Sequence, residues 1–259
     1  MRLIDIGIDA ARMLRVAGVG QVRAVFGRAV YLDVPGGLVS LVVAPAPRGP
    51  LHLRVPALPA TEPDFPVMVG SATLTIADST YPLDAPLWVP RLPPAALLAP
   101  LRPALARWLP DAPPALDVGP AGCTGLPPAA LAALRRGDLL SLAAMIGGRG
   151  PGLTPAGDDV LAGVLLVANA LRTGASPGLL LDCASRAQTN DFARAFLGCA
   201  ARGRSIQPAH ELLAALARAN HEAVNSAVGD LRRFGSSSGA ALTYGIRVAL
   251  LELPGRRST

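Results

Sequence analysis

The pattern of apolar residues changes near residue 95, and this change constrains the fold of the 259-residue chain more than any other feature. Before it, segments such as QVRAVF, AVYLDV and LVSLVVA alternate or run through β-branched residues, and PLHLRV, SATLTI and LWV add shorter strand candidates. After it, the sequence is rich in Ala and Leu with helical spacing. We therefore predict an α+β protein: a small β-rich barrel or sandwich over residues 1–95, then an all-helical domain over residues 96–259.

Proline and glycine set the expected limits of the helices. The segment PPAALAALRRGDLLSLAAMI is expected to form a helix with proline in its first turn. Thr189 is the expected N-cap of a helix that ends near Gly203. Pro208 is expected to open an amphipathic helix that runs to about Val228 and stops at Gly229.

The composition favours a large core and excludes several classes of protein. Apolar residues make up 51% of the chain and charged residues 16%, against roughly 25% charged in an average domain. All 24 basic residues are arginine and the net charge is +6, but they are scattered, so we expect no nucleic-acid partner. The apolar runs are too short to cross a bilayer and the N-terminus does not resemble a signal peptide, which predicts a cytoplasmic protein without a membrane partner. The low charge leaves apolar surface for a partner, so we expect at least a homo-oligomer.

Cysteine and histidine show no spacing typical of a metal site. The odd number of cysteines indicates reduced, buried thiols, at Cys123, Cys183 and Cys199. The histidines show neither metal nor Ser-His-Asp spacing and are expected to be ordinary surface or helix residues, at His52, His210 and His221. We therefore predict no metal site from these residues.

The segment GGRGPGLTPAGDD, from Gly147 to Asp159, is the strongest candidate for a functional site. Thr154 stands where an N-cap is expected, and Pro155 at the first helical position. The N–H groups at a helix start have no partner within the helix, and with the helix dipole they form an anion site. Gly157 inside a helix costs roughly 1 kcal/mol against alanine, which indicates a close approach there. The residues expected to bind an anion in this turn are Gly150, Gly152, Leu153, Thr154 and Gly157.

Asp158 and Asp159 are the candidate catalytic residues, because they fall near the first turn of the same helix. Adjacent helical residues point about 100° apart, so one aspartate can face a ligand while the other braces the turn. Both can instead bind a hard cation through water. The alternative without a function is a capped helix whose dipole favours acidic residues.

A second glycine-bracketed turn, GSSSG, precedes the last helix of the chain. Its hydroxyls can cap this helix or donate hydrogen bonds to an oxyanion, and a simple polar turn is the alternative. The candidate binding residues in this turn are Ser236, Ser237, Ser238 and Gly239.

With these residues considered together, the chain resembles the AllH-like subunits of oxamate carbamoyltransferase. The resemblance rests on GLTPAGDDVLAG, where the family pattern is G-L-T-P-S-G-D-D, and on GQVRAVFGRAVYLDV, TNDFARAFLGCAARG and GSSSG. Ala156 replaces the usual serine, and Ser236 and Ser237 stand where the family usually has a histidine and a threonine. Within the third segment, Thr189 is a further candidate for binding substrate.

The resemblance implies an activity and partners. One family member has an assigned activity, the reversible phosphorolysis of oxalurate to oxamate and carbamoyl phosphate in purine (allantoin) breakdown. That member works together with two other subunits, one of them FdrA-like. Carbamoyl transfer needs no organic cofactor; it needs positioning and charge stabilisation. A doubly charged phosphate group needs positive charge in its binding site. This charge could come from a neighbouring subunit or from arginines of this chain, for which the candidates are Arg149, Arg186, Arg232 and Arg233.

Three hypotheses follow from the sequence. The first is a subunit of a carbamoyltransferase-type enzyme that binds phosphate, carbamoyl phosphate or a small carboxylate at Gly150–Asp159 and Ser236–Gly239. The second is a non-catalytic ligand-binding or scaffold subunit of a metabolic complex. The third is a metal-dependent hydrolase that uses Asp158 and Asp159, for which the sequence offers no obvious third ligand.

Overall fold

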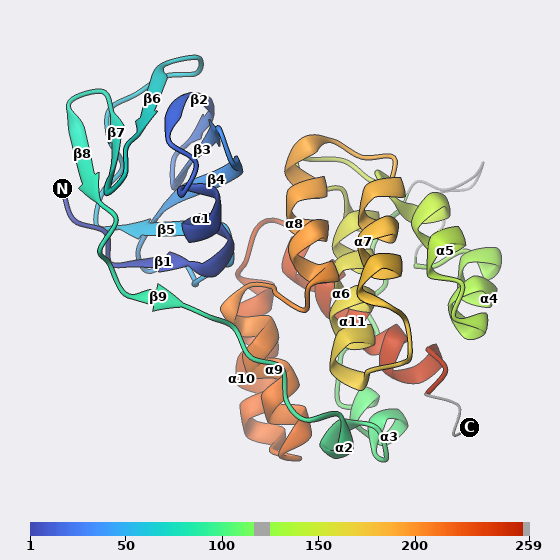
Figure 1. Cartoon of the computed structure of the whole chain (residues 1–259). Helices are drawn as coiled ribbons and strands as arrows, with labels where there is room; N and C mark the ends of the chain where they lie inside the picture. The colour runs from blue at the N-terminus through green and yellow to red at the C-terminus, as the bar shows by residue number, and fades with distance from the viewer. Residues whose placement is uncertain (117–124, 256–259) are drawn as a thin grey trace. The chain divides into compact units, whose positions relative to one another are not determined.

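The computed structural model describes residues 1–116 and 125–255, and it has strands in its N-terminal part and helices in its C-terminal part. The chain divides into two compact units, Met1–Pro90 and Arg91–Thr259 (Figure 1). This architecture confirms the predicted α+β class. Cys123 lies outside the described residues, while Cys183 and Cys199 are buried.

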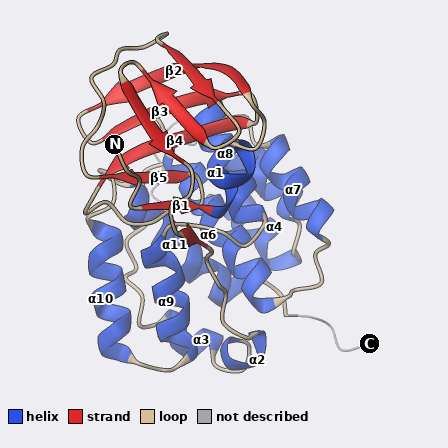
Figure 2. Cartoon of the chain, turned by 60° about the vertical axis from the view of Figure 1, so that its left-hand side comes forward, coloured by secondary structure: helices blue, strands red, loops and turns tan. Residues whose placement is uncertain are grey.

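The N-terminal unit contains a single curled sheet, which resembles half a barrel more than a sandwich (Figure 2). Its strand order is β8-β7-β6-β2-β3-β4-β5-β1-β9. The strands are β1 (Asp5–Gly7), β2 (Gly18–Phe26), β3 (Ala29–Val34), β4 (Gly37–Val43), β5 (His52–Val55), β6 (Pro66–Val69), β7 (Thr73–Ile76), β8 (Ser79–Pro82) and β9 (Leu87–Trp88), and a short helix α1 (Ile8–Met13) follows β1.

Alternating side chains explain how these strands form a core. In β3, Val30, Leu32 and Val34 are buried, while the residues between them are partly exposed. The same alternation occurs in β6 and β7. β2 and β3 pair in antiparallel fashion around a two-residue turn, with Phe26 opposite Ala29. The inward row of each strand therefore builds the core that period-2 patterning predicts.

An ion-pair group around the buried Asp5 joins β1 to β5 in this unit. Asp5 accepts hydrogen bonds from Arg54 and from Nε of Arg48, the latter at 2.9 Å. Burial by itself raises the pKa of Asp5, but the two arginines outweigh it and the pKa is lowered. His52, also in β5, is buried, so the expectation that it is a surface or helix residue is wrong.

The helical unit is built around α6 (Ala156–Leu171), of which 13 of 16 residues are buried. The other helices are α2 (Ala95–Leu98), α3 (Arg102–Ala106), α4 (Pro128–Arg136), α5 (Leu139–Ile146), α7 (Pro177–Arg186), α8 (Asp191–Ala201), α9 (Gln207–Ala217), α10 (His221–Arg232) and α11 (Ser238–Glu252). α6 packs so closely on α11 that only glycine fits at two points of contact. A Cβ at Gly163 would overlap backbone atoms of α11, and a Cβ at Gly245 would overlap the Val160 carbonyl. No helix among the described residues is long and apolar enough to cross a membrane.

Two expected helices are each divided into two. The Pro208–Val228 segment forms α9 and α10, because Ala219 has a positive φ of 50° and Asn220 caps the second helix. Gly229 lies inside α10 and does not end it. The Pro127–Ile146 segment divides into α4 and α5 at Gly137, whose φ is 72°. In both places the apolar spacing continues across the break, so periodicity alone does not reveal it.

Candidate functional site

The candidate site lies where α6 and α11 begin, in the helical unit. The hydroxyl groups of Thr154 and Ser238, 84 residues apart in the sequence, are 2.8 Å from each other. Thr154 is not the N-cap of α6, as expected from the sequence; Pro155 takes that position and makes no side-chain cap. The Thr154 hydroxyl therefore joins the two helix starts instead of capping one of them.

The glycines of the first turn fit tightly against other parts of the chain. Gly148, Gly150 and Gly152 have φ values of 71°, 99° and 101°, which a residue with a Cβ rarely adopts. A Cβ at Gly148 would overlap the Gln188 carbonyl, and one at Gly157 would overlap the Ile146 carbonyl. The group that closely approaches Gly157 is thus the backbone of the chain itself. Gly152 is different, since it is exposed and a Cβ there would meet open space.

Several N–H groups at the two helix starts already have partners. The Gly157 N–H donates to the Arg149 carbonyl at 2.8 Å, and the Asp158 N–H to the Pro155 carbonyl at 2.9 Å. At α11, the Gly239 N–H donates to the Phe234 carbonyl at 3.1 Å. What these helix starts offer an anion is therefore mainly their dipoles and the nearby hydroxyls.

Asp158 is buried, with only 2% of its surface exposed, and its side chain binds two other segments of the chain. Its Oδ1 accepts a hydrogen bond from the Gly148 N–H at 3.0 Å, and its Oδ2 accepts a short one from the Thr189 hydroxyl. Both carboxylate oxygens therefore bind the chain and hold two loops together. Burial raises the pKa of Asp158, although the Thr189 and Gly148 hydrogen bonds and the charge of Arg194 act in the opposite direction.

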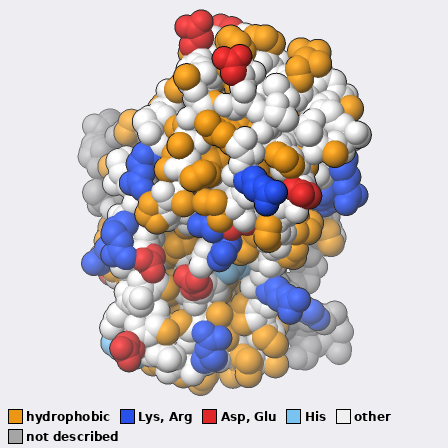
Figure 3. Space-filling model, turned by 90° about the vertical axis from the view of Figure 1, so that its left-hand side faces the viewer, with side chains coloured by type: hydrophobic (Ala, Val, Ile, Leu, Met, Phe, Trp, Pro, Cys, Tyr) orange, Lys and Arg blue, Asp and Glu red, His pale blue; other side chains and the backbone are white. Residues whose placement is uncertain are grey.

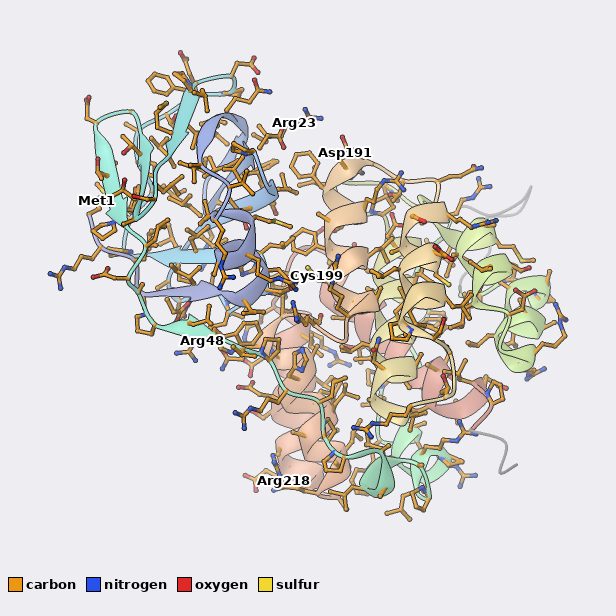
Figure 4. All side chains as sticks on the ribbon, in the orientation of Figure 1. Met1, Arg23, Arg48, Asp191, Cys199 and Arg218 are labelled. Atoms are coloured by element: carbon orange, nitrogen blue, oxygen red, sulfur yellow. The ribbon has the colours of Figure 1, made fainter. Side chains whose placement is uncertain are left out.

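The start of α8 supplies two residues that sequence reasoning missed, one at its N-cap and one in its first turns. Asn190, not Thr189, is the N-cap of α8: its Oδ1 accepts from the Ala193 N–H at 3.0 Å. The Asn190 amide also donates to the Leu153 carbonyl at 2.9 Å and so fixes the first glycine turn. A sequence signal existed, because Asn is as good an N-cap as Thr and stands next to it. Asp191, labelled in Figure 4, lies in the first turn of the same helix.

Arg194 is the second residue that was missed. Its guanidinium donates to the Ser185 and Thr189 carbonyls, each at 2.8 Å. It therefore locks the turn that presents Thr189 to Asp158. The only sequence signal for this role is its place in the TNDFARA segment.

Asp159 has a different environment from its neighbour. Its Oδ2 is buried and accepts no hydrogen bond from the described residues. Burial, assisted by the charge of Asp158, raises the pKa of Asp159 to about 7, while the Ser238 and Thr154 hydroxyls lower it. A carboxyl group with such a pKa exchanges a proton readily near neutral pH.

The second glycine turn is more exposed than the first. Ser236 and Ser237 are exposed, whereas Ser238 is half-buried against Thr154. Ser237 takes the N-cap position of α11 without a side-chain hydrogen bond. A Cβ at Gly239 would overlap the Leu231 carbonyl, so this glycine is required by the packing of α10 on α11.

The positively charged side chains considered from the sequence lie at the surface. Arg149, Arg186, Arg232 and Arg233 are all exposed, and Arg233 forms an ion pair with Asp230. In residues 1–116 and 125–255, no three His, Cys, Asp or Glu side chains gather in a way that could hold a metal ion. Asp158 and Asp159 thus gain no third ligand there.

The contacts of His210 indicate a structural role for its side chain. It is buried in α9, its Nε2 accepts from the Ser205 N–H at 3.0 Å, and its Nδ1 lies 3.0 Å from the Arg91 carbonyl. Nδ1 must therefore carry the proton and donate it to that carbonyl. Burial lowers the pKa of His210 to about 4, which keeps the ring neutral.

Residues 145–250 match the model of a known protein family, described as oxamate carbamoyltransferase subunit AllH. The matched segment contains both glycine turns and the TNDFARA segment, so the match confirms the resemblance for these three parts of the chain. The N-terminal segment GQVRAVFGRAVYLDV lies outside the matched residues. No curated protein and no solved structure matches the chain.

Proposed function

We propose that this chain is a subunit of a carbamoyltransferase-type enzyme and that the starts of α6 and α11 bind its substrate. The family match makes an oxamate carbamoyltransferase subunit the starting point. The observation that carries the site assignment is the Asp159 carboxyl group, whose buried Oδ2 accepts no hydrogen bond from the described residues. Buried polar atoms are nearly always hydrogen-bonded, so an exception beside two helix starts favours a ligand site.

The proposed reaction gives Asp159 a chemical role. In oxalurate phosphorolysis, a phosphate oxygen attacks the carbamoyl carbon, the bond from that carbon to the oxamate nitrogen breaks, and the nitrogen takes up a proton. A carboxyl group with a pKa of about 7 can donate this proton at neutral pH and recover one from the attacking hydrogen phosphate. Asp158 then acts as a positioning residue, since both of its oxygens bind the chain.

The anion is proposed to bind on the exposed side of the two turns. Two helix starts place their positive dipole ends there, and Thr154 and Ser238 supply hydroxyls beside Asp159. Gly152 leaves open space, and Ser236 and Ser237 are exposed. The proposed contact residues for phosphate, carbamoyl phosphate or a small carboxylate remain Gly150, Gly152, Leu153, Thr154, Gly157, Thr189, Ser236, Ser237, Ser238 and Gly239.

Partners are proposed because the site has little positive charge of its own. The charge of Arg194 lowers the pKa of Asp158, but its guanidinium donates its hydrogen bonds to the backbone carbonyls of Ser185 and Thr189. A phosphate group normally needs charge-assisted hydrogen bonds from arginine or lysine. We propose that an FdrA-like subunit, or a second copy of this chain, supplies them in a cytoplasmic complex. Hydrophobic side chains at the surface offer area for such contacts, as Figure 3 shows for one face.

A non-catalytic binding or scaffold subunit is the second candidate. One observation favours it: the Gly157 and Gly239 N–H groups bind carbonyls of the chain, so these glycines already have a packing role. In that case the glycine turns would hold a ligand or a partner loop without taking part in the reaction. Turnover that depends on Asp159 separates the two candidates.

The test is an assay of the chain together with the proteins that co-purify with it. Carbamoyl phosphate formation from oxalurate and phosphate is measured for the wild type, Asp159→Asn and Asp182→Asn, the last being the same change at an exposed site on α7. We expect Asp159→Asn to lower the rate by about 100-fold or more, as for loss of a general acid, and Asp182→Asn to have no effect. Full activity of Asp159→Asn would leave only the binding or scaffold role.

A further inference from the structure

We infer that Asp159 recognises the amide nitrogen of the substrate, so that the site distinguishes a primary amide from a methyl group of the same size. This inference rests on the proposed function and specifies which part of the substrate Asp159 contacts. It starts from the buried Asp159 Oδ2, which accepts no hydrogen bond from the described residues. A ligand with an N–H or O–H group would supply the hydrogen bond that this oxygen does not receive from the described residues.

The neighbouring hydroxyls do not complete this acceptor. Thr154 and Ser238 lie 2.8 Å apart, so one of the two hydroxyls donates to the other. Both act on Asp159 and lower its pKa, yet Oδ2 remains without a hydrogen bond from the described chain. The Asp159 side chain as a whole stays partly exposed, and Gly152 beside this turn has open space around it. The exposed side of the first glycine turn is the side from which we propose that a ligand reaches Asp159.

The charges around Asp159 decide the type of donor. Asp158 is the next residue, and its charge already opposes ionisation of Asp159. An anionic group placed directly against this pair would add to the repulsion. The described residues bring no third His, Cys, Asp or Glu side chain to this pair, so a metal ion there would depend on water or substrate oxygens for the rest of its coordination. A neutral N–H group meets the need of the acceptor without either difficulty.

A small carboxylate that carries a primary amide fits these conditions at both ends. Its amide N–H groups face Asp159, and its carboxylate faces the helix start of α11 with the exposed Ser236 and Ser237. Oxamate has this form, whereas pyruvate has a methyl group in place of the amide nitrogen.

The same nitrogen is the atom that gains or loses the proton during carbamoyl transfer. In the direction of oxalurate synthesis, the oxamate nitrogen forms a bond to the carbamoyl carbon as the bond from that carbon to the phosphate oxygen breaks. The nitrogen gives up a proton to Asp159, from which it passes to the departing phosphate. Recognition and proton transfer thus use one contact, between the nitrogen and the Asp159 carboxylate.

The test compares oxamate with pyruvate. Dissociation constants are measured by calorimetry for the full-length chain and for its complex with co-purified partners. We expect the wild type to bind oxamate about tenfold more tightly than pyruvate, as for one hydrogen bond to a charged group. Asp159→Ala should bind the two ligands with nearly equal affinity, and Asp159→Asn, which keeps the size of the side chain, should lose most of the preference. The exposed control Asp182→Asn should retain it.

The outcomes separate this inference from the proposed function. Equal binding of oxamate and pyruvate by the wild type, or a preference that survives in both Asp159 variants, overturns the amide contact and leaves the substrate site in place. Binding of neither ligand by the chain or its complex overturns the proposed function and this inference with it. Circular dichroism shows that each variant is folded before its affinity is compared.

Discussion

The two glycine turns begin neighbouring helices, but the chain fixes them to different degrees. The first turn is held by Asp158, which accepts from the Gly148 N–H, and by Asn190, which donates to the Leu153 carbonyl. In the second turn, Ser236 and Ser237 are exposed, and the Ser238 hydroxyl links the turn to Thr154. A turn held by several hydrogen bonds thus lies beside a more exposed one, and Asp159 lies next to the hydroxyl pair that joins them.

Glycines in both turns serve the packing of the chain. Gly157 and Gly239, one at each helix start, face carbonyls of the chain, from Ile146 and Leu231. Gly152 instead has open space where a Cβ would be. Function is therefore better indicated by the buried carboxyl group that lacks a hydrogen bond from the described chain than by the number of glycines.

The largest expected effect is on stability and applies to both turns. Gly157→Ala and Gly239→Ala should each lower the free energy of unfolding by about 3 kcal/mol, because the added Cβ overlaps a carbonyl oxygen held in packed backbone. Gly152→Ala, with a φ of 101° but open space, should cost only about 1 kcal/mol. Urea unfolding followed by circular dichroism measures all three. Equal losses at the three positions would contradict the packing role.

The next largest expected effect is the pH dependence of the free energy of unfolding, which should change in Asp159→Asn. Because the pKa of Asp159 is raised from 3.8 to about 7 in the folded state, the wild type loses stability as the pH rises from about 4 to about 7. Asp159→Asn removes this titration. It should be more stable than the wild type at pH 8, on the order of 2 kcal/mol, and not more stable at pH 4. Urea unfolding at several pH values measures the difference, and a gap that is the same at pH 4 and pH 8 would count against the raised pKa.

Asp158→Asn should instead be less stable than the wild type at neutral pH. Its two oxygens accept hydrogen bonds from Gly148 and Thr189, and an amide cannot accept both, so we expect a loss of about 1.5 kcal/mol at neutral pH. Thr189→Val should cost a similar amount, and the double variant less than the sum of the two single losses. Additive losses would show that Asp158 and Thr189 act independently.

The smallest effect concerns the link between the turns. Thr154→Ala should lower stability by about 1 kcal/mol through its lost contact with Ser238. If the contact is the cause, Thr154→Ala combined with Ser238→Ala should be little worse than either variant alone. A full additional loss in the double variant would indicate separate roles for the two hydroxyls.

Local sequence patterns predicted the class of fold and drew attention to the candidate site. Alternation of apolar residues predicted β2, β3 and β4, and Ala/Leu-rich helical spacing predicted the helical unit. β1, β6 and β8 were not predicted. β1 has only three residues, and β8 is a short edge strand. In β6 the side chains alternate between buried and exposed, but its sequence PVMV is apolar throughout and does not show that alternation. The break between α9 and α10 was also missed, since no glycine or proline stands at Ala219 and Asn220.

The sequence by itself also placed the glycine turns and the aspartate pair together at a helix start, because those signals lie within a few residues of one another. It left open which aspartate braces the turn, and it assigned Thr154 and Thr189 to caps that they do not form. The tertiary structure decided these points, since Asp158 meets Thr189 across 31 residues and Thr154 meets Ser238 across 84. Such contacts depend on how α6, α8 and α11 pack, and side-chain periodicity within one helix carries no information about that packing.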